Sequence, residues 1–437
     1  MKTYIKNISA ETVDQEVTLQ WWVQNIRSSG KIAFVELRDG TGYMQCIIMK
    51  KKEWSAEWLE ASKFESVESL GQESSLSVTG VISKHPKKEE YELQVSDVYI
   101  YQNSKDYPLG TKDDHGPEFL FDNRALYLRS KSQVAIMKVR DTIIHATYDW
   151  MRANDFIKID APIFTPNACE GTTDLYEVEH VNGEKMYLSQ SGQLYIEAAI
   201  FGHNRVFDFG PVFRAEQSKT RRHLNEFWMM DAEMAFATQE ENMQVQEQLI
   251  YYIIQEVLTL NKQDLEILGR DTTLLSNITL PFPRVQYKDR VDELIKLWYD
   301  VKQWEDIWSD KEMQYCENIT QPMFLTNFPT SFKSFYFKED PKNPWTVLGS
   351  DLLAPEGCGE VIWGGTREDS YEKLLQAIKD HNLPEEYFDR YLDLRKYGSV
   401  PHGGFGYGLE RIVRRLCGLH HIRETIPFPR YANRITP

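Results

Sequence analysis

The chain has 437 residues, of which 41% are hydrophobic, 27% charged and 13% aromatic. This composition is typical of a globular protein and excludes a disordered or fibrous chain. Because domains usually span about 100–200 residues, the length predicts two or three of them. The sequence contains neither an apolar run of the roughly 20 residues that a membrane helix needs nor a signal-peptide core near its first residue, so we expect a cytoplasmic protein.

The charge and the cysteines narrow the class of protein further. Fifty Lys and Arg against 66 Asp and Glu give a net charge of −16. Overall acidity argues against a nucleic-acid partner, but a large enzyme can still carry one basic face, so local residues must decide. The five cysteines include no CxxC pair, which predicts reduced thiols rather than a zinc site: Cys46, Cys169, Cys316, Cys358 and Cys417.

Residues 1–102 have the pattern of short strands. Apolar residues alternate with polar ones from Val17 to Val23, from Ala33 to Leu37 and again from Tyr91 to Val95, and a turn signal lies at residues 39–42. This indicates a small antiparallel barrel. A five-stranded OB-fold fits the length, and a sandwich fits nearly as well.

Residues 103–130 are rich in Pro, Gly and Asp and have no clear period, which is typical of a linker or hinge. A second domain follows at 131–437. Its first element is a helix, because apolar residues from Ile136 to Trp150 recur at intervals of three and four. The helix should end at Asn154-Asp155. Pro162 and Pro166 then confine the extended segment 156–166 to an edge or an interface.

The rest of the second domain mixes strands and helices without strict alternation. We expect mostly strand up to Phe236, a helix at 239–260, irregular structure at 270–345, and strands with two helices at 346–437. This order favours an α+β fold with an antiparallel sheet over a doubly wound parallel sheet.

Three stretches of the second domain carry candidate chemistry. In the first, residues 213–236, a cationic loop (Lys219, Arg221, Arg222 and His223) joins two apolar ends. A generic hairpin tip would explain the loop, but not Arg214 and Glu216, which we expect to share one side of a strand. An Arg held rigidly there can bind a phosphate with two hydrogen bonds.

The second stretch, GGFGYGLER at 403–411, lacks the spacing of a dinucleotide or P-loop motif and could be a simple tight turn. However, Glu410-Arg411 at the start of the following helix could direct an Arg towards a phosphate. The third stretch, 351–367, places Asp351 and Glu360 on a predicted strand–loop–strand. These could be ordinary ion-paired carboxylates, but near phosphate-directed arginines they are better explained as ligands of Mg²⁺.

Together these stretches resemble motifs 2 and 3 of the class II aminoacyl-tRNA synthetases and the metal-binding strand between them, and FIKIDAPIFTP resembles motif 1. Behind an OB-like domain, this order resembles the aspartate, asparagine and lysine subgroup. Four segments are most similar in sequence to asparaginyl-tRNA synthetases: ACEGTTDLYEV, LSQSGQLYIEA, RRHLNEFWM and RETIPFPR. The resemblance implies an OB-fold anticodon-binding domain at 1–102 and a class II catalytic domain at 131–437.

The resemblance implies ATP and Mg²⁺ as cofactors, and asparagine and tRNA(Asn) as partners. Arg214 and Arg411 are the implied catalytic cations, on the α- and γ-phosphates, and Phe227 and Arg411 would enclose the adenine that Glu216 recognises. Asp351 and Glu360 would hold Mg²⁺. The remaining implied ligands are Arg222, His223 and Gly408 for ATP, Glu170, Ser189, Gln193, Glu226 and Arg367 for the amino acid, and Arg27, Phe34, Gln45 and Glu92 for the anticodon.

Two alternatives stay open. Aspartyl enzymes carry a lysine after the QLY at 193–195, where this chain has Ile196, and that difference favours asparagine over a substrate with a second anion. The C-terminal RYANRITP nevertheless resembles aspartyl enzymes equally well. A synthetase-like paralogue, such as an amide ligase, is the other alternative. The resemblance also implies a homodimer whose two-fold interface uses the apolar face from Ile136 to Trp150 and the strand through Pro162.

Overall fold

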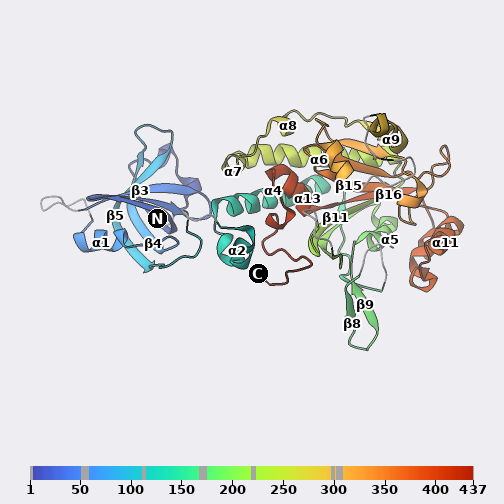
Figure 1. Ribbon diagram of the computed structural model, residues 1–437, viewed down its shortest axis with the longest axis horizontal. Helices are drawn as coiled ribbons and strands as arrows, with labels where there is room; N and C mark the ends of the chain where they lie inside the picture. Colours follow the sequence, from blue (N-terminus) through green and yellow to red (C-terminus); the bar gives the residue numbers. More distant parts are fainter. Residues whose placement is uncertain are drawn as a thin grey trace. The chain divides into compact units, whose positions relative to one another are not determined.

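The computed structural model describes residues 3–50, 59–110, 115–166, 175–217, 223–296, 301 and 309–436. The chain divides into two compact units, residues 1–121 and 122–437 (Figure 1). The division falls inside the predicted linker, which contains the short helices α2 (Pro117–Asp122) and α3 (Arg124–Tyr127). Within the described ranges, no helix combines the length and the apolar character needed to cross a membrane.

The first unit is a closed five-stranded barrel, so the predicted OB-fold is confirmed and the sandwich is not. Its strands follow the order β1-β2-β3-β5-β4, with helix α1 (Ala61–Glu68) between β3 and β4. Buried and outward-facing residues alternate along β2 as predicted: Ala33, Val35 and Leu37 are buried, while Phe34 and Glu36 face outward. The strand bounds are Glu16–Ser29 (β1), Ile32–Arg38 (β2), Tyr43–Met49 (β3), Ser75–Lys84 (β4) and Tyr91–Gln102 (β5).

The second unit is built on an eight-stranded sheet of order β12-β13-β14-β15-β16-β11-β10-β6. Only the two edge pairs, β12 with β13 and β6 with β10, are parallel, so the predicted α+β fold is confirmed. The short strand β6 lies at an edge, as predicted for the segment 156–166 that contains it. The bounds are Ile157–Lys158 (β6), Arg205–Phe213 (β10), Glu226–Ala235 (β11), Arg284–Gln286 (β12), Met323–Thr326 (β13), Ser350–Ala354 (β14), Gly359–Thr366 (β15) and His402–Gly408 (β16).

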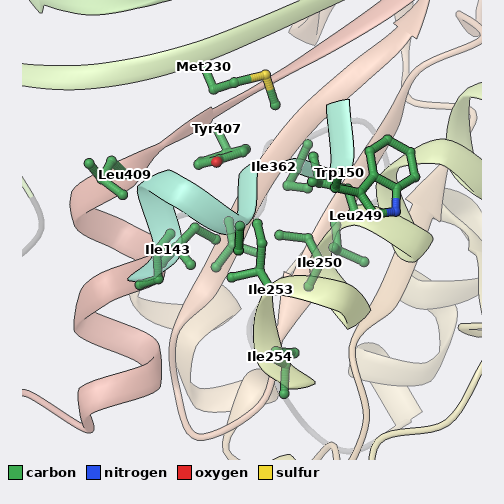
Figure 2. Close-up of a cluster of buried hydrophobic side chains, with 14 of the residues drawn as sticks. Ile143, Trp150, Met230, Leu249, Ile250, Ile253, Ile254, Ile362, Tyr407 and Leu409 are labelled. Atoms are coloured by element: carbon green, nitrogen blue, oxygen red, sulfur yellow. The ribbon is translucent and has the colours of Figure 1, made fainter. Parts of the chain in front are cut away.

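Long helices cover one face of this sheet and form the main core (Figure 2). Helix α4 (Lys131–Ala153) ends at Asn154 as predicted, and α6 (Gln239–Leu260) begins with a capping box between Thr238 and Glu241. The labelled side chains of Figure 2, among them Ile143 and Ile253 on the helices and Met230 and Tyr407 on the strands, pack against one another.

The apolar face of α4 is used inside this core. Ile136, Val139, Ile143 and Trp150 are all buried against the sheet and α6. The expectation that this face forms a two-fold interface is therefore wrong, since the side chains already have partners within one chain.

Several elements differ from the sequence prediction. Helix α5 (Gln193–His203) lies in the stretch predicted to be mostly strand. The sequence of this helix is largely apolar, so the helical period that buries Ile196, Glu197 and Ile200 is not visible in it. Three helices follow residue 346 rather than two: α11 (Tyr371–Asp380), α12 (Asp389–Lys396) and α13 (Leu409–Cys417).

The segment predicted to be irregular, 270–345, contains the edge strand β12, its neighbour β13 and several short helices. These helices are α8 (Thr273–Ser276), α9 (Tyr287–Lys296) and α10 (Ser309–Cys316), and α7 (Lys262–Ile267) precedes them. A separate small sheet of order β7-β9-β8 joins Phe164–Thr165 (β7), Glu177–Glu179 (β8) and Lys185–Leu188 (β9).

Candidate active site

A cavity of about 240 Å³ on the second unit brings the three motif stretches together. The first contributes Arg214, the third contributes Glu360, and the glycine-rich stretch contributes Arg411. The predicted residues that line the cavity are Arg214, His223, Phe227, Glu360, Gly408 and Arg411. Cations from two elements therefore face one space that also contains a carboxylate and an aromatic ring.

The loop after β10 is held by its own backbone contacts. Strand β10 ends at Phe213, so Arg214 and Glu216 follow the strand rather than lie on it as expected. Asn225 fixes both residues, because its Nδ2 donates to the carbonyl oxygens of Arg214 at 2.6 Å and of Glu216 at 3.0 Å. The Arg214 guanidinium lies 5.5 Å from the centre of the Phe227 ring. Arg222, Lys219 and Arg221 lie outside the described residues.

His223 and Glu216 form the flank of this loop. His223 Nε2 lies 3.8 Å from a carboxylate oxygen of Glu216, and both side chains are partly exposed. Glu216 does not line the cavity, unlike His223. The two residues that the sequence assigned to adenine and phosphate are thus neighbours, but only His223 lines the cavity.

The glycine-rich stretch forms strand β16, not a tight turn. Its glycines are needed because carboxylates of β11 press against it: a Cβ on Gly404 would lie 2.2 Å from the Glu233 carboxyl group, and one on Gly406 would lie 2.4 Å from Asp231 Oδ1. Helix α13 then places Arg411, whose Nη1 donates to both the backbone oxygen and Oε1 of Glu360 at 3.1 Å.

Asp351 and Glu360 lie on adjacent antiparallel strands, β14 and β15, as predicted. One oxygen of Asp351 accepts a hydrogen bond from Lys333 Nζ, while the buried Oδ1 has no hydrogen-bond partner among the described residues. Burial raises the pKa of Asp351 to about 7, and the Lys333 ammonium acts in the opposite direction.

This carboxylate pair fits a hard divalent cation, since it offers a buried acceptor oxygen beside a second carboxylate. No group of three or more potential metal-ligating side chains occurs in the part of the chain that the structure describes. A metal here would therefore take its remaining ligands from water or substrate.

Sequence reasoning missed one wall of the cavity. Phe332, Lys333, Ser334, Tyr336 and Phe337 all come from the segment predicted to be irregular. The only signal for them in the sequence was the cluster of aromatic residues in TSFKSFYF. Such a cluster more often belongs to a hydrophobic core than to a functional site.

Arg367 directly follows β15 and lies in a fully buried cluster with Glu233 of β11. Its Nε donates to Glu233 Oε1 at 3.0 Å, and its side chain is 1% exposed. Burial alone would lower the pKa of Arg367, but the Glu233 carboxylate outweighs burial and raises it. Among the described residues, Nη1 has no hydrogen-bond partner, so one edge of the guanidinium is left to donate.

Gln193 is positioned by a second buried network. Its Nε2 donates to Glu197 Oε1 at 3.1 Å, and Glu197 also accepts from Arg395 at 2.9 Å and lies 3.1 Å from His402 Nε2. Burial opposes ionisation of Glu197, but Arg395 and His402 lower its pKa. Because the amide nitrogen is engaged, the amide oxygen of Gln193 is the side chain's remaining acceptor. Sequence reasoning found Gln193 but not its supports.

The other predicted amino-acid ligands are placed differently. Ser189 is buried and its Oγ donates to the Ser191 carbonyl at 2.8 Å. Glu170 lies outside the described residues. Glu226 begins β11 and, by strand alternation, faces away from the side of Phe227 and Met229, so the structure does not bring it to Arg367.

Asp231 is a further buried carboxylate that sequence reasoning missed. Its Oδ2 accepts from Ser191 Oγ and from the Gly192 backbone, both at 2.9 Å. Burial raises the pKa of Asp231 to about 7. It shares a face of β11 with Glu233, and alternation along the strand was the available signal.

On the barrel, the four predicted anticodon residues lie on adjacent strands. Arg27 of β1 is opposite Phe34 of β2 in the register, and Gln45 of β3 is opposite Glu92 of β5. Gln45 Nε2 donates to Glu92 Oε1 at 2.5 Å, and Glu92 is buried. Lys50 pairs with Glu65 at 3.0 Å, whereas Lys51 and Lys52 lie outside the described residues.

The chain is similar to known families over both units. Residues 116–432 match the tRNA synthetases class II (D, K and N), and residues 17–101 match the OB-fold nucleic acid binding domain. The predicted family resemblance is thereby confirmed.

Solved structures of asparaginyl-tRNA synthetases resemble the whole chain. The enzyme of Pyrococcus horikoshii complexed with asparaginyl-adenylate is 38% identical, with 100% of each chain covered and a TM-score of 0.95. The asparaginyl-tRNA synthetase of Entamoeba histolytica is 30% identical over 100% of this chain and 99% of that one, with a TM-score of 0.90.

An aspartyl-tRNA synthetase is less similar. The enzyme of Entamoeba histolytica is 25% identical over 100% of this chain and 93% of that one, with a TM-score of 0.85. These identities favour the asparaginyl prediction over the aspartyl alternative. The motif stretches that meet at one cavity, the barrel and the match over residues 116–432 lead to one conclusion: the chain belongs to the class II tRNA synthetases of the D, K and N group.

Proposed function

We propose that this protein ligates asparagine to tRNA(Asn) through an asparaginyl-adenylate. The supporting observation is the cavity that Arg214 and Arg411 line together with the Glu360 carboxylate, in a chain that is 38% identical to an asparaginyl-tRNA synthetase solved with that adenylate. In the first step, the asparagine carboxylate forms a bond to the α-phosphorus of ATP and pyrophosphate leaves. In the second, the tRNA hydroxyl attacks the carbonyl and AMP leaves.

The first step needs charge stabilisation rather than a general base. The attacking carboxylate is ionised at pH 7, so the protein must align it and neutralise the negative charge that develops on phosphate oxygens. Arg214 is suited to the α-phosphate, because Asn225 and the Phe227 ring hold its segment in place. Arg411 and His223 are suited to the outer phosphates, and the Phe227 ring offers the adenine a stacking surface on the cavity wall that also contains Gly408. Glu216, whose carboxylate lies 3.8 Å from His223 Nε2, is the residue we propose to recognise the adenine amino group.

Asp351 and Glu360 are the residues we propose to hold Mg²⁺. The buried Oδ1 of Asp351, which has no hydrogen-bond partner in the described part of the chain, supports this assignment. When bound, Mg²⁺ neutralises charge on the phosphate oxygens of ATP. Arg411 donates to Glu360 and so fixes the direction of that carboxylate.

We propose that Arg367 reads the side chain of asparagine and that Gln193 binds its ammonium group. The Arg367 charge is already matched by Glu233, so a second carboxylate on the substrate would meet a neutralised cation and a nearby anion. A neutral amide avoids this repulsion. Discrimination of 10³–10⁴ against aspartate needs about 4–6 kcal/mol, which charge repulsion in a buried site can supply.

Ile196 supports the asparagine assignment only indirectly. It is fully buried in a small apolar cluster with Ile200 and Val206. Replacing it by lysine would place an ammonium among aliphatic side chains and destabilise the fold, so this substitution is not a clean test of specificity.

For the tRNA, we propose that the outward Phe34 stacks on an anticodon base beside Arg27, Gln45 and Glu92, and that residues 103–130 act as a hinge. We also propose a cytoplasmic location, which is supported by the buried thiols of Cys46 and Cys417.

We propose that the enzyme is a homodimer. The supporting surface lies near the β6 edge of the sheet, where Ile157 of β6, Tyr148 of α4 and Trp228 of β11 are 45%, 37% and 39% exposed. The ring of Tyr148 contacts Phe207 and Phe209, and Trp228 meets Phe209 edge-on, so these side chains are anchored on β10. An anchored apolar surface of this kind is typical of protein–protein contacts.

The decisive experiment is amino-acid-dependent exchange of pyrophosphate into ATP, with asparagine and aspartate measured side by side. We expect exchange with asparagine only. Equal exchange with aspartate would replace the proposal by the aspartyl alternative, and exchange with neither would favour a synthetase-like paralogue.

A further inference from the structure

Lys333 occupies an unexpected place on the proposed metal ligand. Its Nζ donates to Asp351 Oδ2, and it lies 3.9 Å from the centre of the Phe328 ring. The two paired side chains are only 13% and 6% exposed. Lys333 nevertheless lines the same cavity as Arg214 and Arg411, which is the proposed nucleotide site.

We propose that Lys333 is a resident counter-ion that a divalent cation displaces from Asp351 and that then binds the phosphates of the nucleotide. The inference rests on the proposed function and deepens it. An ammonium and a divalent cation that share one carboxylate repel each other, so binding of the metal ion weakens the hold on Lys333. A lysine has a flexible four-carbon stem, which allows the ammonium to turn towards the phosphates.

The charges around Asp351 explain why a counter-ion is needed in the ligand-free protein. Glu360 lies on the adjacent strand, and its negative charge disfavours a second negative charge on Asp351. Glu312 adds a third carboxylate, which accepts a hydrogen bond from the backbone N–H of Glu360 at 2.9 Å. Lys333 is the cation that bonds Asp351, while Arg411 bonds Glu360. The two carboxylates proposed as metal ligands, Asp351 and Glu360, therefore each have a cation of their own in the ligand-free site.

Lys333 differs from Arg214 and Arg411 in the partners that hold its charged group. Arg214 is held near the Phe227 and Trp363 rings, and Arg411 contacts a backbone oxygen as well as a carboxylate. Arg411 keeps its contact with the Glu360 backbone oxygen when a divalent ion takes the Glu360 carboxylate, whereas the Asp351 carboxylate is the only hydrogen-bond acceptor of Lys333 among the described residues. Lys333 is therefore the cation that loses its oxygen partner outright when the metal ion binds.

The test uses Lys333→Met and measures two affinities of the full-length protein. Mn²⁺ binding to the nucleotide-free protein is followed by electron paramagnetic resonance, and ATP binding in the presence of saturating Mg²⁺ is followed by calorimetry. We expect Mn²⁺ to bind at least about fivefold more tightly, since its competitor is gone, and ATP to bind about tenfold more weakly, since a phosphate contact is lost. A merely structural role would weaken both.

Two matched variants complete the design. Lys338→Met removes a nearby lysine that pairs with Asp369 and does not line the cavity, and it should leave both affinities unchanged. Lys333→Arg keeps the positive charge and should bind Mn²⁺ as weakly as the unmodified protein. It also covers the case in which the Met variant does not fold.

Different results would contradict the counter-ion role of Lys333 and the proposed enzyme function. If Lys333→Met leaves both affinities unchanged or lowers both, the counter-ion role is wrong while the enzyme assignment stands. If Asp351→Asn binds Mn²⁺ as well as the unmodified protein does, Asp351 is not a metal ligand, and the inference fails together with the metal assignment. Asparagine-dependent exchange tests the enzyme assignment separately.

Discussion

Arg140 of α4 and Glu410 of α13 form a buried ion pair that ties the core to the active site. Arg140 Nη1 donates to Glu410 Oε1 at 2.8 Å, and the side chains are 9% and 1% exposed. The second oxygen of Glu410 accepts from the Trp228 backbone at 3.1 Å. Glu410 thus links α4, α13 and β11, and it directly precedes Arg411.

Breaking this pair should destabilise the fold. Arg140→Met leaves the Glu410 carboxylate buried without its cation, and removing one partner of such a pair typically costs about 3–5 kcal/mol. We expect a loss of that size in the free energy of unfolding, measured by urea denaturation. Lys138→Met is the control on the same helix. Lys138 lies 3.8 Å from Asp264 and is partly exposed, so its loss should cost less than about 1 kcal/mol.

Arg214→Ala and Arg411→Ala should each reduce asparagine-dependent pyrophosphate exchange by about 10²-fold or more. Each removes a preorganised cation from the place where transition-state charge develops. Arg152→Ala, on the exposed side of α4, should leave exchange unchanged. Full exchange activity in both cavity variants is incompatible with the proposed roles.

The barrel and the glycine strand show how much the sequence could predict. Alternation from Ala33 to Leu37 identified the buried face, because strand burial follows a period that is visible locally. The cavity cations Arg214 and Arg411 were found because the surrounding residues resemble family motifs. The glycines of β16 stay ambiguous in sequence, since the carboxylates that require them, Asp231 and Glu233, lie on another strand.

The features that were missed depend on contacts between distant segments. Helix α5 is nearly all apolar in its middle, so no single face stands out from its sequence. Lys333 has its partner 18 residues away and lies in a segment with weak local preferences. Glu226 and Glu233 lie on opposite faces of β11. Which of these faces lines the cavity is determined only when the whole sheet is assembled.

Asp231 predicts a pH dependence of stability. Its pKa of about 7 in the folded protein lies above the ordinary value of 3.8, so the folded state binds the proton more tightly than the unfolded chain does. The contribution of this group to stability is therefore complete below about pH 4 and is lost as the pH rises through 7.

Asp231→Asn should remove this dependence, because its amide oxygen can still accept from Ser191 and Gly192. Between pH 5 and pH 8, we expect the free energy of unfolding to shift by about 2–3 kcal/mol in favour of the variant. Asp141→Asn, at an exposed position of α4, should show no such shift. Parallel pH profiles for Asp231→Asn and the unmodified protein would mean that Asp231 is ionised throughout this range.

Phe34→Ala should weaken tRNA charging and leave exchange without tRNA nearly unchanged. The residue lies on the barrel, whereas the cavity is formed entirely by the second unit. Loss of one stacked base typically costs about 1–3 kcal/mol, or roughly 5–150-fold in tRNA affinity. The control is Tyr99→Ala, which removes an aromatic ring that is 64% exposed on β5. Equal losses of charging and exchange in the Phe34 variant would identify a structural role.

The β6 edge predicts the oligomeric state. If the anchored apolar side chains there meet a second copy, the unmodified protein should sediment at twice its chain mass of 51.2 kDa. Tyr148→Asp and Ile157→Asp would each bury an unpaired carboxylate in such an interface and should shift the protein towards monomer. The matched control is Tyr397→Asp, at a residue that is 76% exposed after α12 and should leave the mass unchanged. A fully active unmodified protein that sediments at the mass of one chain would contradict the proposed homodimer.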